Sequence, residues 1–305
     1  ASLHGEVHVT GAKNSVLKLM AASLLAVGKT TITNVPDIAD VDIMSDLLSR
    51  LGCTIQRNNS IITITVPEEP LHRADYDLVR KMRASINVLG PLLAKLKKVE
   101  VALPGGDAIG SRGLDYHISG LEALGATIHL EHGYIIAEAP NGLTGANVTL
   151  DFPSVGATEN LMTAGVLANG VTVIDNAARE PDVVYLGEFL IAMGAKIEGL
   201  GSTQIRIEGV AKLNPVTHAT IPDRIIAGTW AFAAAITQGD ILIKNCRPDH
   251  LEMPLEKLTN AGAVVTDSDE GLRVRMEHRP KAIDVSTLPY PGFPTDLQPM
   301  MIALD

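Results

Sequence analysis

The residues best suited to binding anions stand at the beginnings of apolar segments. Lys13 and Asn14 open one such segment, and Ser154, Val155 and Gly156 open another. Backbone N–H groups at a helix N-terminus attract anions, and a Lys there adds a full positive charge. The Ser hydroxyl and the Gly N–H at such a turn suit a diphosphate. A helix cap is the alternative interpretation of Asn14.

The segment LPGGDAIGSR, residues 103–112, places Asp107 and Arg112 among glycines. Glycines allow a loop to move over a ligand, and a guanidinium can bind phosphate through two N–H groups. Asp107 could act as an acid only if burial or neighbouring anions raised its pKa. The alternatives are an Asp that begins a turn and a solvated loop Arg.

Four further charged residues stand near the beginnings of predicted helices: Arg83, Asp115, Arg224 and Asp296. Arg83 precedes an apolar run, so its alternative role is an Arg that reaches back to solvent. Asp115 would also suit a helix cap, and Asp296 would also suit the helix dipole. A structural ion pair is an equal alternative for Arg224.

The elements that must position these residues recur at intervals of about 70 residues. An apolar residue followed by Gly ends a helical run at Gly52, Gly125, Gly194 and Gly262, and we expect each Gly to be left-handed. Strands are predicted after each of these glycines. A second predicted helix in each repeat is apolar almost all round, which indicates burial inside an assembly. These buried helices cover residues 14–28, 84–96, 157–170 and 225–239.

The predicted unit is therefore helix, strand, helix, strand, strand. A fifth unit begins at residues 294–296 and reaches only Asp305, so we expect the natural chain to be longer. The aromatic content of 3% fits tightly packed helices of small residues.

Composition narrows the class of protein. With 305 residues, 46% of them hydrophobic and 20% charged, disorder is excluded and two domains are expected. The net charge of −10 disfavours a nucleic-acid binder. Two cysteines, Cys53 and Cys246, exclude a disulfide framework, and we expect both to pack as small hydrophobes in a reducing cytoplasm. We expect no membrane span and no signal peptide.

Two weaker motifs are assigned no function. The GKT at residues 28–30 lacks the first Gly of a phosphate-binding loop, because Ser23 stands in its place. The run HLEH at residues 129–132 fits a surface strand, on which His132 points away from the other two polar residues. We therefore expect no metal and no cofactor.

The segments GAKNS, RASINVLGPLLA, LPGGDAIGSR, PSVGATEN, PDRIIAGT and PGFPTD resemble, in order along all 305 residues, the enolpyruvyl transferases that act on UDP-N-acetylglucosamine. The resemblance implies an α/β fold, the inside-out barrel of EPSP synthase, in which βαβαββ units form two similar domains with buried helices and outer sheets. It implies that residues 13–220 form a complete domain carrying the catalytic loop. Residues 1–12 and 221–305 would then form a second domain, incomplete at its C-terminal end.

The resemblance also implies an activity. The enolpyruvyl group of phosphoenolpyruvate would pass to the 3-hydroxyl of UDP-N-acetylglucosamine with release of phosphate, the first committed step of peptidoglycan synthesis. Such an enzyme serves cell-wall biogenesis, cell shape and division. We expect a cytoplasmic monomer that acts on these two small molecules, with no nucleic-acid or membrane partner.

Site roles follow from the resemblance, residue by residue. Asp107 stands where most members carry a cysteine and would protonate C3, while Asp296 would take the proton of the sugar hydroxyl. Lys13 and Arg112 would bind phosphoenolpyruvate, and Asn14 would contact both substrates.

The remaining matched residues would contact the UDP-sugar or lie near the substrates: Arg83, Asp115, Ser154, Val155, Gly156 and Arg224. Because fosfomycin alkylates the loop cysteine in the family, Asp107 predicts insensitivity to it. Asn87 and Phe152 depart from the Trp and Lys of other members, so those contacts would be lost.

Three alternatives stay open. A non-catalytic UDP-sugar-binding paralogue would keep Asn14 and Ser154 but lose Asp296 or Arg112, and all are present. The shikimate-pathway enzyme carries Lys-Ser where this chain has Lys13 and Asn14. An RNA-end cyclase would need a catalytic His and basic grooves.

Overall fold

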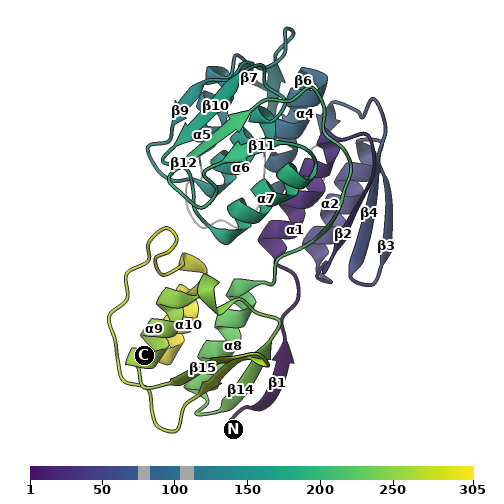
Figure 1. Cartoon of the computed structure of the whole chain (residues 1–305). Helices are drawn as coiled ribbons and strands as arrows, with labels where there is room; N and C mark the ends of the chain where they lie inside the picture. The colour runs from purple at the N-terminus through teal and green to yellow at the C-terminus, as the bar shows by residue number, and fades with distance from the viewer. Residues whose placement is uncertain (75–82, 104–112) are drawn as a thin grey trace. The chain divides into compact units, whose positions relative to one another are not determined.

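The computed structural model describes residues 1–74, 83–103 and 113–305 (Figure 1). The described chain divides into two compact units. Unit 1 comprises residues 1–12 and 221–305, and unit 2 comprises residues 13–220. Among the described residues, no helix has the length and apolar character needed to cross a membrane.

Among the described residues of unit 2, three helices with apolar sequences run through the interior. They are α1 (Lys13–Ala22), α4 (Leu89–Leu96) and α6 (Val155–Gly165), and short 3₁₀ segments η1 (Ser23–Leu25) and η2 (Arg83–Val88) adjoin the first two. Residues 15–22 of α1 and 157–165 of α6 are all buried. The predicted burial of these helices is confirmed. Outside them lie α2 (Ala39–Arg50), α5 (Asp115–Ala123) and α7 (Pro181–Ala192).

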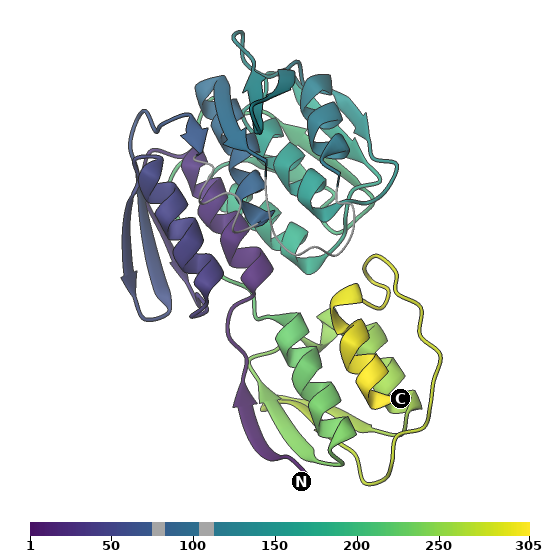
Figure 2. The ribbon, with the colours of Figure 1, turned by 180° about the vertical axis from the view of Figure 1, so that it is seen from behind.

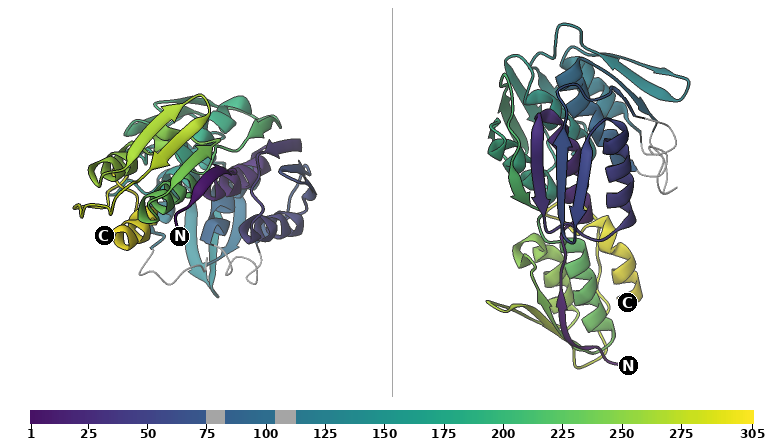
Figure 3. Two further views of the ribbon diagram at one scale, coloured as in Figure 1. Left: turned by 90° about the horizontal axis from the view of Figure 1, so that it is seen from below. Right: turned by 90° about the vertical axis from the view of Figure 1, so that its right-hand side faces the viewer.

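In the described part of unit 2, three four-stranded sheets form the outside, and all have the same strand order: β13-β2-β4-β3, β5-β6-β8-β7 and β9-β10-β12-β11. In each sheet the first pair is parallel and the other two pairs are antiparallel. Figures 1 and 3 show the sheet of β2, β4 and β3 along one side of the unit, outside α1 and α2. The strands of this unit are β2 (Gly28–Thr33), β3 (Thr54–Asn58), β4 (Ile61–Val66), β5 (Arg73–Ala74), β6 (Lys98–Ala102), β7 (Thr127–Glu131), β8 (Tyr134–Glu138), β9 (Asn147–Thr149), β10 (Val171–Asp175), β11 (Lys196–Glu198), β12 (Gln204–Glu208) and β13 (Thr217–Ala219).

Unit 1 repeats the same pattern once. Its sheet has the order β1-β14-β16-β15, and its helix α8 packs against α9 and α10, as Figure 2 shows from behind. Its elements are β1 (His4–His8), α8 (Arg224–Ile236), β14 (Asp240–Lys244), η3 (Pro248–His250), α9 (Glu252–Asn260), β15 (Val264–Ser268), β16 (Gly271–Arg275), η4 (Thr295–Leu297) and α10 (Gln298–Leu304).

The first strand of two sheets comes from a distant part of the chain. Strand β1 precedes α1 in sequence but pairs in parallel with β14 of unit 1, whereas β13 precedes α8 but pairs with β2 of unit 2. The chain therefore passes between the units twice, after β1 and after β13. The repeat in the sequence does not reveal this exchange, because β13 is three residues long.

The predicted helix ends are confirmed. Gly52, Gly125, Gly194 and Gly262 have φ of 96°, 91°, 110° and 109°, the left-handed conformation expected just after a helix. These glycines let each outer helix stop and turn directly into the next strand.

Asparagine repeats at the ends of three central strands. Asn34, Asn176 and Asn245 follow β2, β10 and β14, and their φ angles are 54°, 54° and 53°. Their side-chain amides donate to the carbonyls of Thr220, Leu150 and Val9, at 2.9, 2.7 and 2.7 Å. Each acceptor directly follows the parallel edge strand, so each amide fastens that strand to its sheet.

One buried amide shapes the second internal helix. The sequence predicts one helix over residues 84–96, but the structure has η2 followed by α4. In a continuous α-helix the Ile86 carbonyl would bond the Gly90 N–H. Here Asn160 Nδ2 donates to Ile86 O at 3.2 Å, and the Gly90 N–H donates to Asn160 Oδ1 at 3.0 Å. The Asn160 side chain thus occupies the place of that helical bond, which explains the change of helix type.

Gly90 also explains why α4 and α6 can lie so close together. A methyl group on Gly90 would lie 2.5 Å from the Asn160 carbonyl oxygen and 2.6 Å from Thr163 Oγ1. Only glycine leaves room for this contact. This contact is an example of the close packing of small residues that the low aromatic content led us to expect.

A buried ion pair joins α1 to α6. Lys18 Nζ lies 2.8 Å from Glu159 Oε2, and the two side chains are 11% and 1% exposed. Burial raises the pKa of Glu159 to about 7, and the Lys18 charge opposes that shift. Glu180 and Asp182, near the start of α7, add to the rise.

Removing one partner of this pair is expected to cost far more stability than removing both. Glu159→Gln leaves the Lys18 charge without a counter-ion, which should lower the unfolding free energy by about 3 kcal/mol. The double variant Lys18→Met/Glu159→Leu removes both buried charges and should lose less. Urea denaturation of the three proteins at pH 8 measures this, and a double variant no more stable than the single one contradicts it.

The pH dependence of the same measurement gives a second readout. Between the ordinary Glu value of 4.5 and about 7, the folded state holds a proton on Glu159 that the unfolded state has released. This residue's contribution to stability therefore falls as pH rises through that window. The wild-type protein should therefore lose unfolding free energy relative to the double variant as pH rises from 4.5 to 7. A difference between the two proteins that stays constant over this range would contradict the prediction.

Candidate active site

Lys13 and Asn14 are the first two residues of α1, and both are exposed. Lys13 Nζ lies 3.8 Å from Asp40 Oδ2, which belongs to the first turn of α2, and the Lys13 side chain is 54% exposed. Because Asn14 is the second helical residue, it does not occupy the capping position, and the alternative interpretation of Asn14 as a cap is wrong. Both side chains begin a buried helix and are open to solvent.

Ser154 caps α6 as its N-terminal residue. Its Oγ accepts from the Ala157 N–H at 3.3 Å, so the Ser154 hydroxyl keeps its proton to donate elsewhere. Val155 and Gly156 follow as the first helical residues, whose N–H groups have no acceptor within the helix. The turn at residues 154–156 therefore has the donors that an anion needs.

Asp115 begins α5 and is exposed. The capping position belongs to Leu114, and Asp115 makes no side-chain cap, so its alternative interpretation is also wrong. Two residues further on, His117 is buried and lies against the turn at residues 154–156. A methyl group on Gly156 would lie 3.3 Å from both Cε1 and Nε2 of the His117 ring. The beginnings of α5 and α6 are thus in contact.

Three predicted residues cannot be placed in full. Asp107 and Arg112 lie outside the described residues. Arg83 is the first residue of η2, which packs against α1 and α6, but its side chain is not described.

Arg224 and Asp296 belong to unit 1. Asp223 caps α8, with its Oδ1 accepting from the N–H groups of Ile225 and Ile226 at 2.9 and 3.0 Å. The Arg224 guanidinium lies 5.6 Å from the centre of the Tyr290 ring. The described neighbour of Arg224 is therefore an aromatic ring rather than the carboxylate that an ion pair would supply.

Buried apolar residues on both sides hold Asp296 in η4, just before α10. Phe293 packs edge-on against Phe232 of α8, with ring centres 6.2 Å apart, and Leu297 fills the space beside Gly228. Asp296 itself is exposed. Contacts with Phe232 and Gly228 of α8 thus hold the segment that presents the Asp296 carboxylate at the surface.

A small cavity adjoins Arg224 in the same unit. It is lined by His250 of η3, the beginning of α9, and the loop of Tyr290 and Pro294 that leads to Asp296. Burial lowers the pKa of His250, and the Asp249 carboxylate opposes that shift. Arg224 Nε and His250 Nδ1 are buried and have no hydrogen-bond partner among the described residues.

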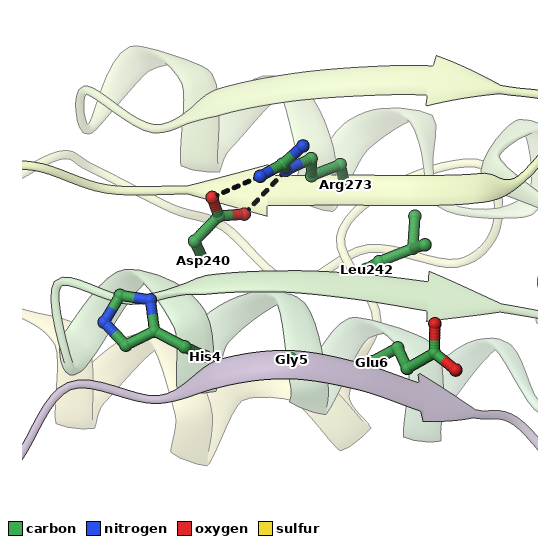
Figure 4. Close-up of a pocket in the computed structure, with 6 residues that line it drawn as sticks. All are labelled: His4, Gly5, Glu6, Asp240, Leu242 and Arg273. Carbon is green, nitrogen blue, oxygen red and sulfur yellow. Dashed lines mark hydrogen bonds and ion pairs between the residues drawn. The ribbon is translucent and has the colours of Figure 1, made fainter.

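A separate hollow lies on the uncovered face of the unit 1 sheet (Figure 4). The Arg273 guanidinium there donates two hydrogen bonds to the Asp240 carboxylate, at 2.7 and 2.6 Å. Because this pairing neutralises the cation, the hollow lacks a free charge for an anion. None of the residues that line it is a predicted site residue.

The two cysteines pack as predicted. Cys53 is buried in the core of unit 2, and Cys246 is partly buried against the core of unit 1. Burial raises the pKa of the Cys53 thiol to about 11, which leaves little thiolate at neutral pH.

Sequence reasoning missed four buried polar residues: Lys18, His117, Glu159 and Asn160. Three of them stand inside otherwise apolar helical runs, in SVLKLMAAS and in ATENLMTAG. A polar residue on a helix that is buried all round must find a polar partner, and this signal could have revealed them.

Comparison with known proteins agrees with the fold. The model of the EPSP synthase (3-phosphoshikimate 1-carboxyvinyltransferase) family matches residues 1–305. The UDP-N-acetylglucosamine 1-carboxyvinyltransferase of Corynebacterium jeikeium (strain K411) is 58% identical over 302 residues, covering 99% of this chain and 72% of that protein. The protein of the same name from Mycobacterium tuberculosis (strain CDC 1551 / Oshkosh) is 57% identical with the same coverage.

Solved structures share the architecture. The enolpyruvyl transferase NikO from Streptomyces tendae superposes with a TM-score of 0.87 at 21% identity, covering 99% of this chain and 72% of that one. EPSP synthase from Acinetobacter baumannii gives 0.72 at 20% identity, covering 99% and 69%. The predicted α/β fold of buried helices and outer sheets is confirmed. This chain belongs to the EPSP synthase (3-phosphoshikimate 1-carboxyvinyltransferase) family.

Proposed function

We propose that this protein transfers the enolpyruvyl group of phosphoenolpyruvate to the 3-hydroxyl of UDP-N-acetylglucosamine, with release of phosphate. The sugar hydroxyl adds to C2 of phosphoenolpyruvate while C3 gains a proton, and the resulting ketal then loses phosphate. This reaction supplies peptidoglycan synthesis.

One observation carries the proposal. Relatives of this name are 57–58% identical over nearly the whole chain, and the described residues that the sequence assigns to the two substrates begin helices in the folded protein. Lys13 and Asn14 begin α1, and Ser154 caps α6. Helix beginnings of this kind hold anions, and both substrates carry phosphate.

The roles of the residues follow the chemistry. Asp296, exposed in η4, takes the proton of the sugar hydroxyl, and Asp107 delivers a proton to C3. Lys13 and Arg112 bind the phosphate of phosphoenolpyruvate. Asn14 contacts both substrates.

The UDP-sugar has its own set of residues. The Ser154 hydroxyl and the N–H groups of Val155 and Gly156 hold its diphosphate, and Asp115 lies on the uracil side. Arg83 and Arg224 act near the substrates. Unit 2 carries most of these groups, whereas unit 1 supplies Arg224 and Asp296. We further propose that the protein is a cytoplasmic monomer.

The base is tested by Asp296→Asn, which keeps the size of the side chain but cannot accept the proton. We expect turnover to fall by about 100-fold or more with an unchanged melting temperature, because Asp296 is exposed. The assay follows phosphate released from phosphoenolpyruvate by the full-length gene product in the presence of UDP-N-acetylglucosamine.

Asp284→Asn serves as a matched control, since it neutralises another exposed carboxylate of unit 1. Substantial turnover by the Asp296 variant would remove this residue from the mechanism. Wild-type protein that binds UDP-N-acetylglucosamine but releases no phosphate at any pH would favour a non-catalytic paralogue.

Fosfomycin is expected not to inactivate the enzyme. A carboxylate at position 107 is a far poorer nucleophile toward the epoxide than a thiolate, and burial holds the pKa of both cysteine thiols high. Intact mass spectrometry after incubation with the drug should show unmodified wild-type protein. Asp107→Cys should gain one covalent adduct. Time-dependent, stoichiometric labelling of the wild type would refute the prediction.

A further inference from the structure

Two buried atoms in unit 1 have complementary hydrogen-bonding character. Arg224 Nε carries a hydrogen that it can only donate, whereas His250 Nδ1 can accept when the ring is neutral. Both atoms are buried, and neither has a hydrogen-bond partner within the part of the chain that the structure describes. Because an unpaired buried polar group is costly, we expect each of them to have a partner other than a protein group.

The surroundings of His250 make its Nδ1 an acceptor. Burial lowers the pKa of His250 against the opposing effect of the Asp249 carboxylate, and the charges of Arg247 and Arg224 reinforce the lowering. The ring is therefore neutral at pH 7. Its Nε2 lies 3.8 Å from Asp249 Oδ2, so the carboxylate favours the tautomer that carries the proton on Nε2. Nδ1 then carries the lone pair.

Arg224 and His250 line the same small cavity. Its volume of about 10 Å³ has room for a single water molecule. A buried water needs at least two polar partners, and a donor and an acceptor are present here. Of the two carboxylates that also line the cavity, Asp249 accepts two hydrogen bonds from Arg247, and Glu252 is exposed. The buried pair that a water can bridge is therefore Arg224 and His250.

We propose that one buried water molecule occupies this cavity, accepting the Arg224 Nε–H and donating to His250 Nδ1, and that His250 thereby acts as a positioning residue for Asp296. The water site does not depend on the enzyme's activity. The effect on Asp296 rests on the proposed function, which makes Asp296 the base.

Arg224 contacts the segment that leads to Asp296. Its guanidinium lies 5.6 Å from the centre of the Tyr290 ring. Tyr290 and Pro294 line the same cavity as Arg224 and His250. A water that fixes the orientation of the guanidinium therefore also fixes the cation–π contact that holds Tyr290.

The turn between Leu288 and Phe293 carries this contact on to Asp296. The Leu288 N–H donates to the Phe293 carbonyl at 3.0 Å, and the Gly292 N–H donates to the Pro289 carbonyl at 2.8 Å. These bonds close the turn on itself, so it moves as one piece. A displacement of the turn is therefore passed to Asp296, which follows directly after it in the chain.

A crystal structure of the full-length gene product tests the water site. We expect one peak of electron density within hydrogen-bonding distance of both Arg224 Nε and His250 Nδ1. A direct bond between the two side chains would overturn the proposal. So would a cavity without density at a resolution that shows other buried waters.

Two substitutions at position 250 test the positioning role. In His250→Asn the side-chain amide reaches the place of Nδ1 and can still accept from the water, whereas His250→Phe keeps a ring but has no acceptor. We expect the Phe variant to lower kcat by about tenfold, because a displaced base is a poor catalyst. Its KM for phosphoenolpyruvate should change by less than about twofold, and the Asn variant should keep kcat within about threefold of wild type.

His278→Phe serves as the matched control, since it makes the same replacement at an exposed histidine of unit 1, and it should leave kcat unchanged. Circular dichroism at the assay temperature establishes that each variant is folded. Equal losses of kcat in the Phe and Asn variants, or a kcat of the Phe variant equal to that of wild type, would overturn the positioning role. Absence of phosphate release by the wild type would instead refute the proposed function, while the crystal structure would still decide the water site.

Discussion

The Asn160 side-chain amide is the interaction on which the arrangement of unit 2 depends. It replaces the helical bond between Ile86 and Gly90, and it also bonds the ring of His117. One side chain on α6 is thereby tied to η2, α4 and α5. Because every one of these groups is buried, losing the amide would leave several polar atoms without partners in a dry interior.

Close approach of the helices makes this hydrogen-bond network possible. The same close approach brings the helix beginnings of the candidate site together. Gly90 allows α4 to meet α6, and Gly156 allows the His117 ring to meet the beginning of α6. The beginnings of α5 and α6 are in contact with each other, while Lys13, Asn14 and Asp115 at the helix beginnings stay exposed. The candidate site in unit 2 is therefore a set of exposed and half-buried helix beginnings that pack on buried polar side chains.

Some of the fold could be predicted from local patterns. Gly52 and its three counterparts end helices as expected, because a residue without a Cβ adopts a left-handed φ near 100° at little cost. The apolar internal helices were predictable from periodicity. The break between η2 and α4 was not, because its cause, Asn160, lies 70 residues away in the sequence. For the same reason, sequence reasoning found Gly156 but missed His117 beside it. It also allowed Asn14 and Asp115 as helix caps, although both residues lie within the first turn of their helices.

The sequence by itself determined the repeat, the element types and the family, since these depend on local spacing and composition. Only the tertiary structure decided which strands complete which sheets, since β1 and β13 each pair with a strand far along the chain. It alone decided the pairing of Lys18 with Glu159 and the contact of Asn160 with His117. These features depend on burial and on the direction of hydrogen bonds between distant segments, which no local pattern contains.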